Sequence, residues 1–180
     1  TIAQPASIAS VVPRLTAKVT LKGTGFSASS VPSISGSGLT ISGTKVTGKT
    51  TAASMAFTVT ASAGASAGLR NITITTIDGK SVTCTDCLSV HALPSVTSIS
   101  PSSTGQNSSR SVTITGSGFV TGLKLKIAGG AGTTLASVVR VNGTSITLTL
   151  KATKTAAKGP RTITITNTDK GYETVTFTIT

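Results

Sequence analysis

Two cysteines form the motif with the widest range of chemistry in this chain. Cys84 and Cys87 are its only cysteines and frame the segment Cys-Thr-Asp-Cys. This spacing occurs in redox centres, where a helix N-terminus lowers a thiol pKa, and in zinc sites. No helix is predicted here, a zinc site with His91 as third ligand would lack a fourth, and Leu88 stands where a c-type haem motif needs histidine. We predict a local disulfide that closes a strand bulge. Free thiols and a metal or redox site are the alternatives.

A cluster of basic residues late in the chain is the second candidate site. Its members lie across the loop before the predicted strand at 163–166: Lys151, Lys154, Lys158 and Arg161. Such a cluster predicts anion binding, and a solvated loop is the alternative, because nucleic-acid surfaces usually add stacking aromatic residues and none lies nearby. Four further lysines lie on polar strand faces, where we interpret them as solubilising or edge-protecting: Lys18, Lys22, Lys124 and Lys126.

Groups for acid–base catalysis are scarce. The chain has one histidine and four acidic residues, whereas 61 of its 180 residues are serine or threonine. Charged residues make up 11%, compared with about a quarter in an average soluble domain. No nucleophile and base can be paired from this set, so we predict a protein that is not an enzyme and needs neither a cofactor nor a metal.

The net charge is strongly positive. Sixteen basic and four acidic residues give +12, and both halves of the chain are basic. A field of this sign favours anionic partners, such as nucleic acid, acidic polysaccharide, teichoic acid or lipid headgroups, and it does not choose among them. Aromatic residues are only 3% of the chain, which argues against specific nucleic-acid binding. No apolar run approaches the roughly 20 residues of a membrane-spanning helix, so we predict no membrane insertion.

Apolar residues alternate with threonine and serine along most of the chain. This period of two places every second side chain on a core face and is typical of strands. No window shows helical periodicity, and Gly, Asn and Asp mark the turns. The sequence therefore predicts an all-β protein of antiparallel β-sandwich type. The clearest strands lie at 19–21, 57–60, 72–75, 112–115, 146–150, 163–166 and 175–179.

The chain also repeats itself. Residues 19–26 match 112–119, 93 positions later, and residues 68–75 match 159–166, 91 positions later. Two copies of one unit follow, with domains at 1–93 and 94–180. The segment 1–7 precedes the first recognisable strand, and we predict that it is a free N-terminal strand able to pair with a neighbouring subunit.

The second copy resembles a known family. It combines a Pro-bounded first strand at 94–103, the block Val-Thr-Ile-Thr-Gly-Ser-Gly-Phe at 112–119, the turn Ala128-Gly129-Gly130 and a final hairpin from Gly159. These features resemble the IPT/TIG family of immunoglobulin-like domains. The resemblance spans 94–180 and is weaker over 8–93. It implies two tandem immunoglobulin-like antiparallel β-sandwiches, and a role as spacer or interaction module of the kind found in bacterial surface proteins.

We therefore expect a secreted or cell-surface structural and adhesive module. It would space or build a surface assembly, such as a filament, a stalk or a phage decoration, through strand edges and Thr/Ser/Lys faces. Its partners would be copies of itself or neighbouring surface proteins. The alternatives are a binding module for acidic glycans or cell-wall polymers, and electrostatic binding of nucleic acid. A single pair of nearby cysteines fits an oxidising, extracytoplasmic location.

Overall fold

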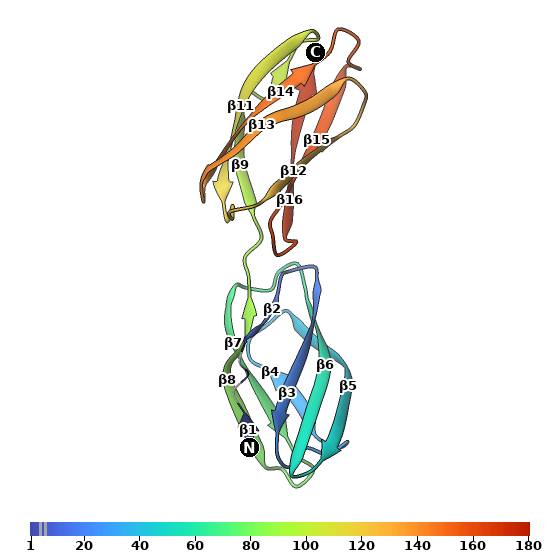
Figure 1. The fold of residues 1–180 in the computed structure, drawn as a ribbon, viewed down its shortest axis with the longest axis vertical. Helices are drawn as coiled ribbons and strands as arrows, with labels where there is room; N and C mark the ends of the chain where they lie inside the picture. Colours follow the sequence, from blue (N-terminus) through green and yellow to red (C-terminus); the bar gives the residue numbers. More distant parts are fainter. Residues whose placement is uncertain (4, 6) are drawn as a thin grey trace. The chain divides into compact units, whose positions relative to one another are not determined.

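The computed structural model of the chain describes residues 1–3, 5 and 7–180. The chain divides into two compact units, Thr1–Ala92 and Leu93–Thr180, which we call domain 1 and domain 2 (Figure 1). Within the described residues, no helix is long and apolar enough to cross a membrane. Domain 1 contains β1 (Ile2–Ala3), β2 (Ala9–Val11), β3 (Thr16–Gly23), β4 (Val31–Ile34), β5 (Leu39–Lys49), β6 (Ala52–Ala61), β7 (Gly68–Thr75) and β8 (Ser81–Val90).

Domain 2 repeats this series of strands. Its elements are β9 (Ser95–Ser100), β10 (Ser103–Thr104), β11 (Ser108–Ser117), β12 (Lys124–Ala128), β13 (Thr133–Asn142), β14 (Ser145–Ala152), β15 (Gly159–Thr166) and β16 (Tyr172–Ile179). Every strand predicted from the alternation lies within one of these elements.

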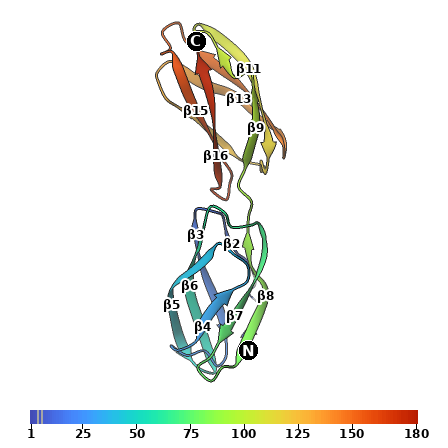
Figure 2. The same cartoon turned by 180° about the vertical axis from the view of Figure 1, so that it is seen from behind.

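Each domain is a sandwich of two four-stranded sheets. In domain 1, sheet 1 has the order β1-β3-β6-β5 and sheet 2 the order β2-β8-β7-β4. In domain 2, sheet 3 is β9-β11-β14-β13 and sheet 4 is β10-β16-β15-β12. Figure 2 views both sandwiches from behind and shows β4 and β7 of sheet 2. This is the strand arrangement of immunoglobulin-like sandwiches, so the predicted fold class is confirmed.

One detail differs from a purely antiparallel sandwich. The short strand β2 pairs with β8 in parallel, and β10 pairs with β16 in parallel, whereas the other strand pairs are antiparallel. In each domain the chain leaves the edge of one sheet and joins the edge of the other. The parallel pair satisfies the backbone groups of this crossing segment.

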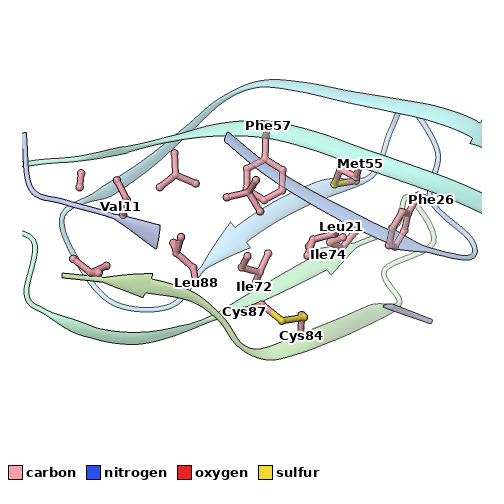
Figure 3. Close-up of a cluster of buried hydrophobic side chains, with 14 of the residues drawn as sticks. Val11, Leu21, Phe26, Met55, Phe57, Ile72, Ile74, Cys84, Cys87 and Leu88 are labelled. Carbon is pink, nitrogen blue, oxygen red and sulfur yellow. A yellow bond between two sulfur atoms is a disulfide. The ribbon is translucent and has the colours of Figure 1, made fainter. Parts of the chain in front are cut away.

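The alternation of residue types is what builds the cores. Along β6, Met55, Phe57 and Val59 point inward and are buried, while Ala56 and Thr58 between them lie on the outer face. The buried residues of domain 1 form one cluster (Figure 3), and those of domain 2 form a separate one around Ile114, Leu148 and Phe177.

One glycine-containing block closes one end of each sandwich. A Cβ on Gly116 would lie 1.9 Å from the backbone oxygen of Ser95 and 2.8 Å from the ring of Phe119. Only glycine therefore lets β9 pass this close, and the strand register shifts at this point. Gly23 and Phe26 repeat the arrangement in domain 1. Both phenylalanines are buried and close the end of the core.

The beginning of the chain corrects one prediction. Ile2 and Ala3 form β1, which pairs with Gly23 and Lys22 of β3, and the Thr24 amide donates to the Thr1 carbonyl at 2.9 Å. Residues 1–3 are thus part of sheet 1 and are not a free strand. Two positions of the predicted 1–7 segment, 4 and 6, lie outside the described residues.

Candidate functional site

The two cysteines form a disulfide in strand β8. Cys84 and Cys87 have a Cα–Cα distance of 5.7 Å, and both are buried in the core of domain 1 (Figure 3). Asp86 between them has a positive φ of 54°, and its amide donates to the Asn71 side-chain oxygen at 3.0 Å. The thiols are therefore consumed by the bond. Among the described residues, no group of three His, Cys, Asp or Glu side chains is placed to hold a metal ion.

The disulfide closes a bulge that domain 2 does not have. Arg70 and Ile72 of β7 pair with Leu88 and Cys84 of β8. These two pairs are separated by two residue positions along β7 and by four along β8. In domain 2 the equivalent pairs lie two steps apart on both strands. The bulge therefore holds two extra residues, and the disulfide joins its two sides.

The predicted basic cluster does not form a single surface. Arg161 on β15 is only 2% exposed. Its Nε donates to Thr133 Oγ1 at 3.1 Å, Nη1 donates to the carbonyls of Gly159 and Pro160 at 3.2 and 3.0 Å, and Nη2 donates to the carbonyl of Ala157. The prediction that Arg161 contributes to an anion site is wrong, because the side chain is buried and its donors are used by backbone carbonyls and a threonine hydroxyl of its own domain.

The three lysines of this cluster are exposed. Lys151 lies on β14, while Lys154 and Lys158 lie on the loop between β14 and β15. Anion binding at these three side chains stays a prediction.

Arg70 is the counterpart of Arg161 in domain 1. Its Nη1 donates to the carbonyl of Leu69 at 3.0 Å and its Nη2 to that of Ser66, but its buried Nε has no hydrogen-bond partner. Each arginine packs beneath a glycine of positive φ, where a Cβ would lie 2.9 Å from the guanidinium group: Gly36 for Arg70 and Gly130 for Arg161. The arginines anchor turns, and their role is structural.

The outer face of sheet 1 gathers four lysines, and we call it the lysine face. Strand β6 runs through its middle and presents only small outward residues: Ala52, Ser54, Ala56, Thr58 and Thr60. Lys18 and Lys22 of β3 flank β6 on one side, and Lys45 and Lys49 of β5 flank it on the other. All four lysines are exposed. The sequence had placed Lys18 and Lys22 on a polar face but had not joined Lys45 and Lys49 to them.

One end of the lysine face is hollowed. An open pocket of about 510 Å³ lies beside β1, where β3 and β5 end and β6 begins, and its lining includes Lys22, Thr47, Ala52 and Ser54. These four residues share the outward face of sheet 1. The hollow therefore continues the floor between the two lysine rows.

Strand β13 presents a different surface at the edge of sheet 3. It pairs with β14 on one side only. Val138, Val139 and Val141 on this strand are 41%, 54% and 57% exposed. An apolar edge with unpaired backbone groups is a template for adding another strand.

Comparison with known proteins identifies the second half of the chain. The model of the IPT/TIG domain family matches residues 94–179. Almost all of domain 2 is thus an immunoglobulin-like module. The match covers the same part of the chain in which the sequence resembles this family. No curated protein matches the chain.

Solved structures resemble the chain in fold. A titin fragment spanning I67–I69 is 15% identical with a TM-score of 0.44, covering 96% of this chain and 62% of the fragment. The Bacteroides ovatus protein SGBP-B, solved with a mixed-linkage heptasaccharide, is 20% identical with a TM-score of 0.32. The match covers 94% of this chain and 42% of SGBP-B. The Yersinia pseudotuberculosis adhesin InvE is 11% identical with a TM-score of 0.37, covering 99% and 58%. The chain thus spans less than two thirds of each of these proteins.

The family match indicates a binding or structural module, and it indicates no catalytic family. The disulfide is consistent with an extracytoplasmic protein.

Proposed function

We propose that the chain is a non-catalytic, extracytoplasmic structural and adhesive module of a surface assembly. It spaces or builds that assembly, in the manner of a filament, a stalk or a phage decoration, through strand edges and through its hydroxyl- and lysine-covered faces. The observation that carries this proposal is the exposed apolar edge of β13 in a protein whose surface is otherwise rich in hydroxyl groups.

The hydroxyl-covered faces are ordered surfaces. Cross-strand hydroxyl pairs occur between Thr73 and Thr83 at 2.8 Å and between Thr75 and Ser81 at 2.9 Å. Each pair links two neighbouring strands on one face of sheet 2 and restrains its side chains. Such a face is suited to repeated contacts with a neighbouring protein, because little side-chain freedom is lost on binding.

The edge of β13 supports association with a second copy. A strand added to β13 would form backbone hydrogen bonds along its length and would cover Val139 and Val141. Because the net charge of +12 makes copies repel one another, association should strengthen as salt screens that charge.

Sedimentation velocity of the full chain over a concentration series at 150 mM salt tests this proposal. We expect concentration-dependent association in the wild type and its loss in Val139→Lys. The control is Ile77→Lys, which adds the same charge at an 83% exposed position in the turn between β7 and β8. A wild type that stays monomeric at all concentrations, and that shows no polymer by electron microscopy, would contradict assembly through this edge.

Acidic-glycan binding is a second candidate function, and the lysine face favours it. Binding of nucleic acid has less support. The four phenylalanines are buried in the two cores, which leaves Tyr172 as the exposed aromatic side chain among the described residues. Without further aromatic side chains, bases have no platform on which to stack.

A further inference from the structure

We propose that the lysine face of sheet 1 binds a linear acidic glycan laid along strand β6. This proposal concerns a ligand site in domain 1 and is independent of self-association through β13 in domain 2.

The lysines are staggered along β6 in a regular order. Their neighbours on β6 are Ala52 for Lys49, Ser54 for Lys22, Ala56 for Lys45 and Thr58 for Lys18. Successive lysines therefore come alternately from β5 and from β3, one for every second residue of β6. With strand geometry this gives a charge about every 7 Å along β6, on two rows about 10 Å apart. Such a pattern matches an extended chain whose anionic groups repeat along its length.

The space between the rows suits a sugar chain. The side chains of β6 on this face are methyl or hydroxyl groups, so the longer lysines stand above them as two walls. Hydroxyl groups of Ser54, Thr58 and Thr47 face the same space and can exchange hydrogen bonds with sugar hydroxyls. The hollow of about 510 Å³ beside Lys22 widens one end of this floor.

No acidic side chain neutralises these lysines from within the sheet. The strands of sheet 1, which are described in full, contain neither Asp nor Glu. The two acidic residues of domain 1 lie elsewhere: Asp78 in the turn between β7 and β8, paired with Lys80 at 3.2 Å, and Asp86 on β8 of the other sheet. The face therefore keeps a uniform positive field, which attracts a polyanion.

The chemistry of the face favours a glycan over single-stranded nucleic acid. Phe57 is the one aromatic residue on the strands of sheet 1, and it points into the core with 3% exposure. Bases would find no ring on which to stack, whereas sugars need only the hydroxyl groups and charges present.

Domain 2 provides an internal comparison. Its corresponding face has Ser111 at the place of Lys18, Thr115 at that of Lys22 and Val139 at that of Lys45, as the strand registers show. Since the same fold carries an almost uncharged face in domain 2, the four lysines are not required by the fold. We therefore assign the glycan site to domain 1 alone.

Binding of polygalacturonate to the full chain tests this assignment. The first variant carries Lys18→Ser, Lys22→Thr, Lys45→Thr and Lys49→Thr. The control variant carries Lys126→Thr, Lys151→Thr, Lys154→Ser and Lys158→Ser, and both lower the formal net charge from +12 to +8. If each exposed ion pair contributes roughly twofold, the first variant should bind about sixteenfold more weakly, and the control within about threefold of wild type.

Four results would overturn the proposal. Equal weakening of both variants would show a response to net charge alone, and weakening confined to the control would place the site at Lys151, Lys154 and Lys158. Undiminished binding of methyl-esterified polygalacturonate would show that the anionic groups are not recognised. Tighter binding of a thymidine oligonucleotide with the same number of charges would assign the face to nucleic acid. Sedimentation of the first variant should match that of wild type, which separates this test from that of self-association.

Discussion

Replacement of the buried arginine of domain 2 is the sharpest test of how these sandwiches are held together. Arg161→Leu keeps apolar bulk under the Gly130 turn and removes the guanidinium group. The carbonyls of Ala157, Gly159 and Pro160 then lose this donor. Arg70→Leu is the matched change in domain 1, where the arginine is partly exposed and its Nε has no partner.

The expected loss follows from the number of bonds. Arg161 donates four hydrogen bonds, and bonds that involve a charged group contribute about 1.5–3 kcal/mol each. Removal of the guanidinium group also removes the cost of burying its charge, which is several kcal/mol. We expect a net decrease of about 3 kcal/mol in the free energy of unfolding of domain 2. For Arg70→Leu we expect a decrease of about 1 kcal/mol in the free energy of unfolding of domain 1, because Arg70 is partly exposed and its Nε lacks a hydrogen-bond partner.

Urea unfolding can follow the two domains separately. Tyr172 is the only tyrosine, the chain has no tryptophan, and Met55 is the only methionine. Tyrosine fluorescence therefore reports on domain 2, and the methionine methyl signal in NMR spectra reports on domain 1. With an m-value of about 1 kcal/mol/M, Arg161→Leu should lower the midpoint of domain 2 by about 3 M and leave domain 1 unchanged.

Two outcomes would refute this reasoning. A loss below about 1 kcal/mol for Arg161→Leu would mean that the buried guanidinium contributes no net stability, as happens for some buried charges. An equally large decrease in the free energy of unfolding for Arg70→Leu and Arg161→Leu would mean that burial and hydrogen bonding of the guanidinium group do not determine its contribution to stability.

Three further predictions follow from particular residues. Gly116→Ala should lower the free energy of unfolding of domain 2 by about 3 kcal/mol in urea, because its Cβ would lie 1.9 Å from a β9 carbonyl oxygen. The control Gly143→Ala, whose Cβ would meet no atom nearer than 3.7 Å, should change that free energy by less than about 0.5 kcal/mol. Reduction of the disulfide, which closes a four-residue loop, should lower the free energy of unfolding of domain 1 by about 2 kcal/mol, as followed by the methionine methyl signal. The unfolding of domain 2, as followed by tyrosine fluorescence, should stay unchanged. The pKa of Asp78 lies below its ordinary value of 3.8, because its carboxylate accepts a hydrogen bond from the Thr76 hydroxyl and interacts with Lys80. The ionised carboxylate therefore stabilises the folded protein above pH 3.8, and this contribution is lost as the pH falls through the lowered pKa. In an NMR titration, Thr76→Val should raise that pKa, and an unchanged value would exclude the hydroxyl as its cause.

Much of the fold was predictable because it depends on local rules. Alternating apolar and hydroxyl residues can bury only one face of a strand, and the internal repeat showed that two units share one topology. The glycines before Phe26 and Phe119 recur at the same place in both copies of the repeat. The cysteines had one available pairing. Each of these features is a property of neighbouring residues or of the repeat itself.

The burial of Arg161 could not be predicted from its neighbours. In sequence it follows three lysines and looks like a fourth exposed cation. Its acceptors include the hydroxyl of Thr133, which lies 28 residues earlier on another strand of the opposite sheet. The first strand was also misjudged, because pairing of β1 with β3 joins segments about twenty residues apart through backbone groups that no side-chain pattern reveals.

The sequence by itself determined the strands, the two-fold repeat, the hydroxyl-rich surface and the charge, since these depend on composition and on a period of two. The tertiary structure decided which charges share a surface. On β5 the register shifts between Ser42 and Lys45, where Gly43 adopts a φ of 63°. This bulge changes which positions point outward and turns Lys45 and Lys49 toward the same face as Lys18 and Lys22. Strand pairing then sets the two lysine rows on either side of β6.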